Sequence, residues 1–300
     1  MNLRDLRYAL AVDEHRHFGR AAEVCNISQS TLSIQLRKLE EELGVVLFER
    51  TTKSVAPTAE AAALLDHARA AVAAADAMIE LAAASRNPRA GRLRLGVIPT
   101  LGPYLLPLVF GALRDALPDL TIEPWEDVTA SLIERLRRHE LDAALLATEL
   151  EGGDVESRPL FEEPFLAALP PDHKLAARAQ VSVEDLAPDI LVLADGHCLR
   201  DQALEACGQM GVGGGALRAS SLPTLMNMVA AGYGTTLIPG LAAGAAADAG
   251  LALRPLAGGV GRRISLVSRA AYPRRAAVEE VAGLIRAKLG RYAGVLEGAA

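Results

Sequence analysis

Residues 20–50, RAAEVCNISQSTLSIQLRKLEEELGVVLFER, decide the fold at the N-terminal end of the chain. Leucines recur in this stretch at the spacing of one buried helix face, at Leu32, Leu36, Leu39 and Leu43. Ser28 is suited to cap the start of that helix, and Gly44 is suited to end it. A shorter helix is expected over 19–25, and a two-residue turn connects it to the longer helix. The segment therefore predicts two helices joined by a tight turn.

The segments on either side extend this small domain. Residues 3–13 carry apolar positions at helical spacing and predict a first helix. The short apolar runs 45–48 and 54–56 flank a polar turn and predict a two-stranded wing. Residues 58–85 are rich in Ala and free of breakers, so they predict one helix of about 42 Å. So long a helix suggests pairing with a second copy, and the break at 87–91 marks a domain boundary.

Downstream of Gly91, predicted strands alternate with predicted helices. The first group comprises strands over 93–97, 121–125 and 142–147 and helices over 104–117 and 129–139. The later group comprises strands over 190–193, 235–239 and 264–269 and helices over 197–210, 222–231 and 274–288. This alternation predicts two α/β subdomains with parallel sheet and helical crossovers. We expect the chain to cross between them near 161–165 and 264–269.

Composition limits the class of protein. The chain has 300 residues, of which 51% are hydrophobic, so it can bury a substantial core. Its net charge is −6. Its first 57 residues hold eight basic and eight acidic side chains, so DNA binding there requires a local basic face. The sequence contains no run suited to a membrane span or signal peptide, so we expect a cytoplasmic protein without membrane contact. It also lacks metal-ligand spacing and a phosphate-binding loop, so no cofactor or metal is expected.

The second helix of the N-terminal segment carries the candidate DNA contacts. Small or hydrogen-bonding side chains near its start are suited to base edges: Ser28, Gln29, Ser30, Thr31, Ser33 and Gln35. Basic side chains are suited to phosphates: Arg37, Arg50 and Lys53. The alternative is a solvated polar helix face with a positive end.

Residues 1–57 resemble the winged helix-turn-helix of LysR-type transcription regulators almost position for position. Residues 195–207, DGHCLRDQALEAC, resemble the redox segment of the OxyR-type members of that family, as do residues 96–107 and 227–232. Other LysR-type regulators share the DNA-binding module but lack the GHCLRD run. The resemblance covers nearly the whole chain. It implies a DNA-binding activator of antioxidant genes, not an enzyme, that senses hydrogen peroxide.

The resemblance also implies an architecture and partners. We expect a winged helix-turn-helix domain over 1–58, a dimerisation helix and hinge over 59–90, and a periplasmic-binding-protein-like α/β regulatory domain over 91–300. Within the latter, subdomain I covers about 91–162 and 268–300, and subdomain II about 163–267. The expected partners are promoter DNA, RNA polymerase, hydrogen peroxide as signal, a thiol reductant for resetting, and the other copies of a homotetramer.

By resemblance, Cys198 and Cys207 are the redox-active pair. Supporting roles at the peroxide site fall, by resemblance or by nearness in sequence, on His197, Thr100, Thr129, Arg269, Arg200 and Asp201. Cys198 begins a predicted helix, where the helix dipole favours the thiolate. If the two cysteines share a helix, a rise of about 13.5 Å separates them on opposite faces, whereas a disulfide needs Cα atoms within roughly 7 Å. Oxidation would therefore unwind the segment.

Other interpretations stay open at this point. The cysteines could be buried and inert, as we expect for Cys25, with the threonines acting only as helix caps and Arg269 as a solvated charge. The chain could be a LysR-type regulator that binds a small organic effector. It could also be a thiol peroxidase with a DNA-binding appendage, which would require rapid turnover with a reductant.

Overall fold

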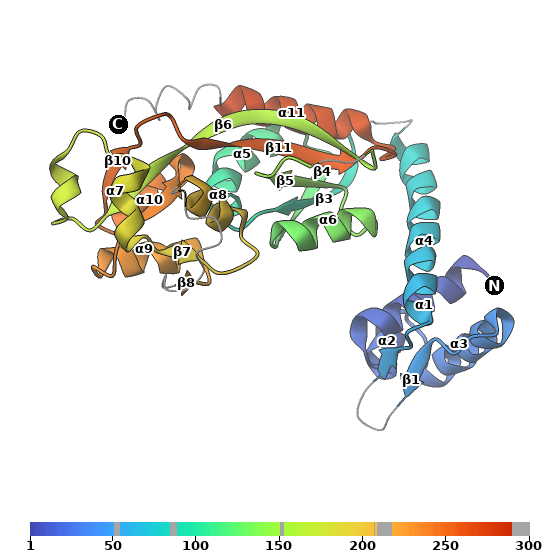
Figure 1. Cartoon of the computed structure of the whole chain (residues 1–300). Coiled ribbons are helices and arrows are strands. Elements are labelled where there is room, and N and C mark those ends of the chain that lie inside the picture. The colour runs from blue at the N-terminus through green and yellow to red at the C-terminus, as the bar shows by residue number, and fades with distance from the viewer. Residues whose placement is uncertain (51–54, 85–88, 151–152, 207, 209–217, 290–300) are drawn as a thin grey trace. The chain divides into compact units, whose positions relative to one another are not determined.

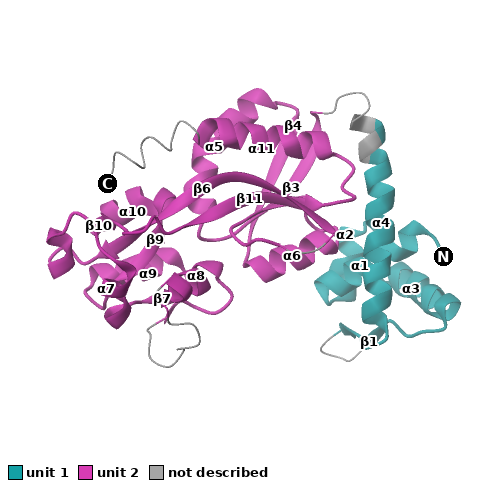
Figure 2. Ribbon diagram, turned by 45° about the horizontal axis from the view of Figure 1, so that its top comes forward, with its two compact units in different colours: residues 1–85 teal, residues 86–300 magenta. Residues whose placement is uncertain are grey.

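The computed structural model describes residues 1–50, 55–84, 89–150, 153–206, 208 and 218–289, without the side chains of residues 50, 80, 81, 83 and 84. The chain divides into two compact units, Met1–Ser85 and Arg86–Ala300, coloured teal and magenta in Figure 2. Each unit is described by itself. In the described residues, no helix combines the length and apolarity that crossing a membrane requires.

The first unit is a helical domain with a small wing. Its elements are α1 (Leu3–His15), α2 (Phe18–Val24), α3 (Gln29–Leu43), β1 (Phe48–Arg50), β2 (Val55–Pro57) and α4 (Ala61–Ala84). Ser28 caps α3 by accepting a hydrogen bond from the Thr31 amide at 3.1 Å, and Gly44 ends the helix with a φ of +71°. The predicted leucine face is confirmed, because Leu32, Leu36 and Leu39 are all buried.

The wing differs from the prediction in its first strand. We expected that strand over 45–48, but β1 begins at Phe48 and pairs antiparallel with β2. The Glu40 carboxylate on α3 accepts hydrogen bonds from the Leu47 amide at 2.8 Å and the Phe48 amide at 3.4 Å. Because the Glu40 carboxylate binds the backbone at Leu47 and Phe48 to α3, pairing with β2 starts only at Phe48.

The second unit holds the α/β elements. Its first part contains β3 (Gly91–Val97), α5 (Gly102–Ala116), β4 (Leu120–Glu126), α6 (Thr129–Arg137), β5 (Ala143–Leu146), β6 (Val155–Leu169), η1 (Lys174–Ala177), α7 (Val183–Leu186) and η2 (Ala187–Asp189). Its second part contains β7 (Val192–Leu193), α8 (Cys198–Ala206), β8 (Arg218–Ala219), α9 (Leu222–Ala230), β9 (Thr236–Pro239), η3 (Gly240–Ala242), α10 (Ala243–Asp248), β10 (Ala252–Pro255), β11 (Gly261–Arg269) and α11 (Arg275–Leu289).

The main sheet of this unit is mixed rather than wholly parallel. Its order is β10-β6-β11-β5-β3-β4, with β9 also paired to β6. Strands β4, β3 and β5 are parallel as predicted, whereas β11 is antiparallel to both β5 and β6. Figure 1 shows β6 and β11 lying side by side along the unit. The 15-residue β6 pairs with β11 along its first part and with β9 and β10 along its last, so one strand serves both subdomains.

Two hydrophobic cores lie along this sheet. One is built around β3, β5, α5 and α11, and the other around β7, α8, α9 and β9. Ile264, Leu266 and Val267 of β11 belong to the first core. The chain therefore returns to the first subdomain at about residue 264, within the stretch 264–269 in which we expect the crossing, because β11 pairs with β5 from Ser265 onward.

Candidate functional site

Cys198 lines a small cavity in the second unit. The cavity is tight, with no room for a water-sized molecule as it stands, and it is formed by Ile98, Pro99, Thr100, Val128, Thr129, Gly196, His197 and Cys198. These residues come from three separate segments: one follows β3, one follows β4, and one leads into the first residue of α8. The structure thus brings together four of the predicted site residues: Thr100, Thr129, His197 and Cys198.

The topology of the sheet explains this assembly. Strands β3 and β4 are parallel neighbours, with Val97 opposite Glu126 at their carboxyl ends. The segments that follow them therefore leave the sheet at the same edge, which is where open α/β sheets bind ligands. The third segment turns at Gly196, whose φ of +94° favours glycine, and places Cys198 as the first residue of α8.

Thr100 is held by an arginine that the sequence reasoning missed. The guanidinium of Arg262, on β11, donates from Nη1 to Thr100 Oγ1 at 2.8 Å and from Nη2 to the Thr100 carbonyl oxygen at 3.1 Å. Thr100 is only 2% exposed. Because arginine only donates, the hydroxyl proton of Thr100 is not used in this contact and is available to another acceptor.

Thr129 presents a second hydroxyl. Its Oγ1 is buried and makes no hydrogen bond within the described part of the chain. The expectation that these threonines cap helices does not hold, since the caps of α5 and α6 are Leu101 and Val128, neither with a side-chain bond. A buried hydroxyl without a partner is costly and calls for an explanation. A ligand in the cavity would supply the missing partner.

Arg262 is itself part of a fully buried ion pair. Its Nε donates to Oε2 of Glu163, on β6, at 2.8 Å, and both side chains have 0% exposure. The two residues face each other in the β6–β11 ladder, next to the exposed pair Arg263 and Glu162. The signal available in the sequence was Glu162 and Glu163 in the predicted crossing near 161–165, with Arg262 and Arg263 just before the predicted strand 264–269. This signal did not say which acid–base pair is buried.

Arg269 does not take the role that we expected beside Cys198. Its Nη1 donates to the carbonyl oxygens of Leu136 at 2.6 Å and Leu141 at 2.5 Å, at the end of α6 opposite Thr129. Burial lowers its pKa from the ordinary value, with Asp142 nearby acting in the opposite direction. Arg269 therefore stabilises the turn before β5, and the arginine beside the cavity is Arg262.

Arg200 and Asp201 also lie outside the cavity lining. Arg200 pairs with Asp201 at 2.9 Å and with Asp195 at 3.1 Å, and Asp195 pairs with Arg218 of β8 at 2.7 Å. These ion pairs hold the segment in which α8 begins. The second predicted redox residue, Cys207, directly follows α8 but lies outside the described residues.

Helix α8 contacts both subdomains. Cys198 is a free thiol that packs against the first core, while Leu199 and Leu204 are buried in the second. Gln202 donates from Nε2 to the Ala147 carbonyl oxygen, just after β5, at 2.9 Å. A change in the conformation of α8 would therefore alter contacts to both subdomains.

The predicted DNA-contacting residues lie largely on one exposed surface of α3. Ser28, Gln29, Ser30 and Thr31 are exposed, as is Arg37, whereas Ser33 and Gln35 are half-buried. The Ser28 hydroxyl is engaged with Thr31 Oγ1 at 2.7 Å and Ser30 Oγ at 2.9 Å, so Ser28 serves mainly as the helix cap. The Arg50 side chain and Lys53 lie outside the described residues.

Two further α3 residues on this surface were missed from the sequence. Ile34 is 55% exposed, although it is apolar, and Lys38 is also exposed. An exposed apolar side chain between polar ones is suited to a thymine methyl, and a lysine to a phosphate. Ile34 was overlooked because an isoleucine in an amphipathic helix is normally assigned to the core.

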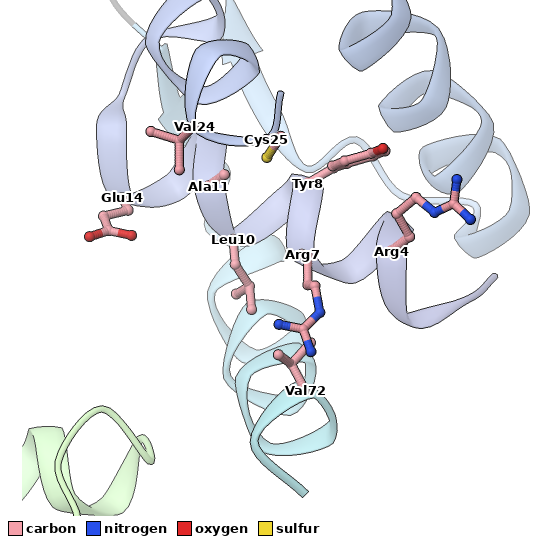
Figure 3. Close-up of a pocket in the computed structure, with 9 residues that line it drawn as sticks. All are labelled: Arg4, Arg7, Tyr8, Leu10, Ala11, Glu14, Val24, Cys25 and Val72. Carbon is pink, nitrogen blue, oxygen red and sulfur yellow. The ribbon is translucent and has the colours of Figure 1, made fainter. Parts of the chain in front are cut away.

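The remaining described cysteine lies in the first unit. Cys25 is the C-cap residue of α2, and burial raises the pKa of its thiol. Figure 3 shows Cys25 in a pocket lined by residues of α1, the end of α2 and Val72 of α4. No group of three or more His, Cys, Asp or Glu residues suited to a metal ion occurs among the described residues.

Comparison with known proteins agrees with this arrangement. The family "Bacterial regulatory helix-turn-helix protein, lysR family" matches residues 3–62, and "LysR substrate binding domain" matches residues 86–290. The chain is 43% identical over 293 residues to the DNA-binding transcriptional dual regulator OxyR of Escherichia coli, covering 96% of each. It is 44% identical over 290 residues to a probable hydrogen peroxide-inducible genes activator of Mycobacterium avium, covering 93% and 92%.

Solved structures show the same likeness. A full-length OxyR variant from Pseudomonas aeruginosa superposes with a TM-score of 0.79 at 37% identity, covering 95% of each chain. A peroxide-bound OxyR variant from Corynebacterium glutamicum superposes with a TM-score of 0.68 at 33% identity, covering 99% of this chain and 95% of the other. Both comparisons include the helix-turn-helix unit and the α/β unit.

Proposed function

Because this chain belongs to the LysR family of bacterial transcription regulators, we propose that it senses hydrogen peroxide by oxidation of Cys198. Its relatives are peroxide-responsive regulators rather than enzymes. In this proposal, a disulfide between Cys198 and Cys207 changes the regulatory unit and thereby activates antioxidant genes.

One observation carries the proposal: Cys198 shares its cavity with two threonine hydroxyls that have hydrogen-bonding capacity left over. Each oxygen of hydrogen peroxide can donate and accept, so the molecule satisfies both hydroxyls at once. The cavity leaves no room for a water-sized molecule in this structure, so even a ligand as small as hydrogen peroxide would enter only with a small movement of the lining. So tight a cavity argues against the alternative of a larger organic effector, because pockets for organic ligands usually measure about 300–1,000 Å³.

The first chemical step is attack by the Cys198 thiolate on one peroxide oxygen. An S–O bond forms and the O–O bond breaks, so the sulfur loses two electrons and the second oxygen leaves as hydroxide. Cys198 is the first residue of α8 and shares its cavity with Thr100 and Thr129. In this proposal, Thr100 and Thr129 donate hydrogen bonds to the oxygen on which negative charge develops.

The second step converts a local oxidation into a structural change. The Cys207 thiolate attacks the sulfenic sulfur of Cys198, an S–S bond forms, and hydroxide leaves. A helical path from 198 to 207 would separate the Cα atoms by about 13.5 Å, whereas a disulfide requires roughly 7 Å or less. Helix α8 must therefore unwind. That would disturb the burial of Leu199 and Leu204 and the contact from Gln202 to Ala147.

The remaining partners follow from the same proposal. The exposed surface of α3 would enter the major groove of promoter DNA, while Arg37, Arg50 and Lys53 contact phosphates. We infer a homotetramer that contacts RNA polymerase and is reset by a cellular thiol reductant. The long α4 is suited to pair with the same helix of a second copy.

The test treats the full chain with one equivalent of hydrogen peroxide and maps thiols by mass spectrometry, beside DNA footprints. We expect a disulfide between Cys198 and Cys207 and an altered footprint. An unmodified Cys198 together with a footprint that responds to an organic metabolite would favour an organic effector. Sustained peroxide consumption at enzyme-like rates with a reductant would favour a thiol peroxidase.

A further inference from the structure

We propose that Glu163 is a positioning residue for the reaction of Cys198 with peroxide. It acts by holding Arg262 against Thr100, so that the Thr100 hydroxyl donates its proton into the cavity. The inference rests on the proposed peroxide-sensing function. Glu163 does not line the cavity itself, and its influence passes through two hydrogen-bonded neighbours.

The two carboxylate oxygens of Glu163 have different partners. Oε2 accepts from Nε of Arg262 at 2.8 Å, and Oε1 accepts from the backbone amide of Leu241, in η3, at 2.9 Å. Both partners are donors, so the site requires two acceptor atoms. A carboxylate supplies them, whereas a glutamine would turn its NH₂ group toward one of the donors.

Burial makes the position of Arg262 depend on this carboxylate. Neither side chain of the pair is exposed, so solvent cannot stabilise the guanidinium if the carboxylate is lost. The Phe165 ring, also on β6, lies 6.0 Å from the guanidinium but supplies no hydrogen-bond acceptor for it. Without the Glu163 carboxylate, the Arg262 guanidinium would therefore shift toward another hydrogen-bond acceptor and away from Thr100.

The orientation of Thr100 depends in turn on Arg262. Two guanidinium bonds, to Oγ1 and to the carbonyl oxygen, fix both the side chain and the backbone at this position. With Oγ1 already accepting from Arg262, the hydroxyl proton is left to be donated elsewhere, and the cavity is the space that Thr100 lines. Glu163 thus controls the direction of a proton donor at the peroxide site, two contacts away.

The neighbouring glutamate offers a matched control. Glu162 precedes Glu163 on β6 and pairs with Arg263 at 2.7 Å, in the same ladder, but both of these side chains are exposed. Glu162→Gln removes the same charge from the same strand without touching the contacts to Thr100. A difference between the two variants therefore reports the buried connection rather than the net charge of the strand.

The experiment uses the full chain with Cys25→Ser and Cys207→Ser, so that Cys198 is the one thiol. Two rates are measured at Cys198: sulfenic acid formation by hydrogen peroxide and alkylation by iodoacetamide. We expect Glu163→Gln to lower the peroxide rate about tenfold, less than the roughly 100-fold or greater loss for removing a donor outright, because the Thr100 hydroxyl stays but loses its fixed orientation. The alkylation rate should not fall, because the substitution removes a negative charge and alkylation needs no donation from Thr100. Glu162→Gln should change neither rate.

A double-mutant cycle with Thr100→Val separates positioning from general loosening. If Glu163 acts through Thr100, Glu163→Gln should have little further effect in the Thr100→Val background. Equal losses in both backgrounds, or a Glu163→Gln variant that behaves like Glu162→Gln, would overturn the proposal. If Glu163→Gln does not fold, Glu163→Asp takes its place, since its shorter side chain cannot reach both donors. Failure of the parent protein to react with peroxide would instead refute the proposed function.

Discussion

Cys25 and Cys198 are both half-buried, yet they lie at opposite ends of their helices. Cys25 is the C-cap of α2, where unpaired carbonyl groups disfavour an anion, and burial raises its pKa further. Cys198 is the first residue of α8 and lines a cavity together with Thr100 and Thr129. The comparison teaches that two thiols of similar exposure can have different neighbours: Cys25 lies at a helix C-terminus, and Cys198 lies beside two threonine hydroxyls.

The sharpest test exchanges each sulfur for oxygen. Cys198→Ser should abolish the peroxide-dependent change in DNA footprint while leaving basal DNA binding intact, because serine cannot form the sulfenic acid. Cys25→Ser should leave the response within about twofold of the parent, because the Cys25 thiol, at the C-cap of α2, is protonated and takes no part in the oxidation. A parent-like response from Cys198→Ser would refute the role of this cysteine.

The surroundings of Cys198 should be sensitive to the loss of Arg262. Arg262→Met leaves Glu163 as a buried unpaired carboxylate, so the free energy of unfolding of the second unit should fall by about 3–5 kcal/mol. Urea unfolding followed by the fluorescence of Trp125, the single tryptophan, reports this unit. The matched variant Arg263→Met, which breaks an exposed pair, should cause a much smaller change. Equal losses in the two variants would contradict the importance of the buried pair.

Thr129 allows the reactivity of Cys198 to be separated from stability. Thr129→Val removes a buried hydroxyl without a described partner, so stability should be unchanged or higher by up to about 1 kcal/mol. The rate of Cys198 oxidation by peroxide should nevertheless fall about 100-fold, because one donor to the reacting peroxide is lost. Trp125 fluorescence and thiol trapping measure the two quantities on the same sample. An unchanged oxidation rate would remove Thr129 from the site.

The smallest expected effect concerns Cys25 itself. Since burial raises its pKa above the ordinary value of 9.0, this thiol is protonated at neutral pH. Its alkylation by iodoacetamide should therefore be slow at pH 7 and should continue to rise with pH beyond 9.0. Peptide mapping across a pH series, with Cys198 replaced by serine, gives the profile. A plateau reached below pH 9.0 would show that Cys25 is more acidic than its surroundings indicate.

Several elements could be predicted because their signals are local. The leucine face of α3, the cap Ser28, the ending at Gly44 and the long helix α4 depend on propensity and periodicity within one segment. The strand–helix alternation after Gly91 likewise predicted β3, β4 and β5 as parallel. Thr100 and Thr129 were found because residues that follow parallel strands share one edge of the sheet.

By itself, the sequence determined the helix-turn-helix, the α/β class and the family, since each is specified by contiguous residues. Only the tertiary structure decided that Arg262 rather than Arg269 lies beside the cavity, and that Glu163 rather than Glu162 is buried. The pairing register of β6 and β11 sets those outcomes, and a shift of one residue would exchange the inward and outward side chains. Register depends on contacts between strands about a hundred residues apart, which no local pattern specifies.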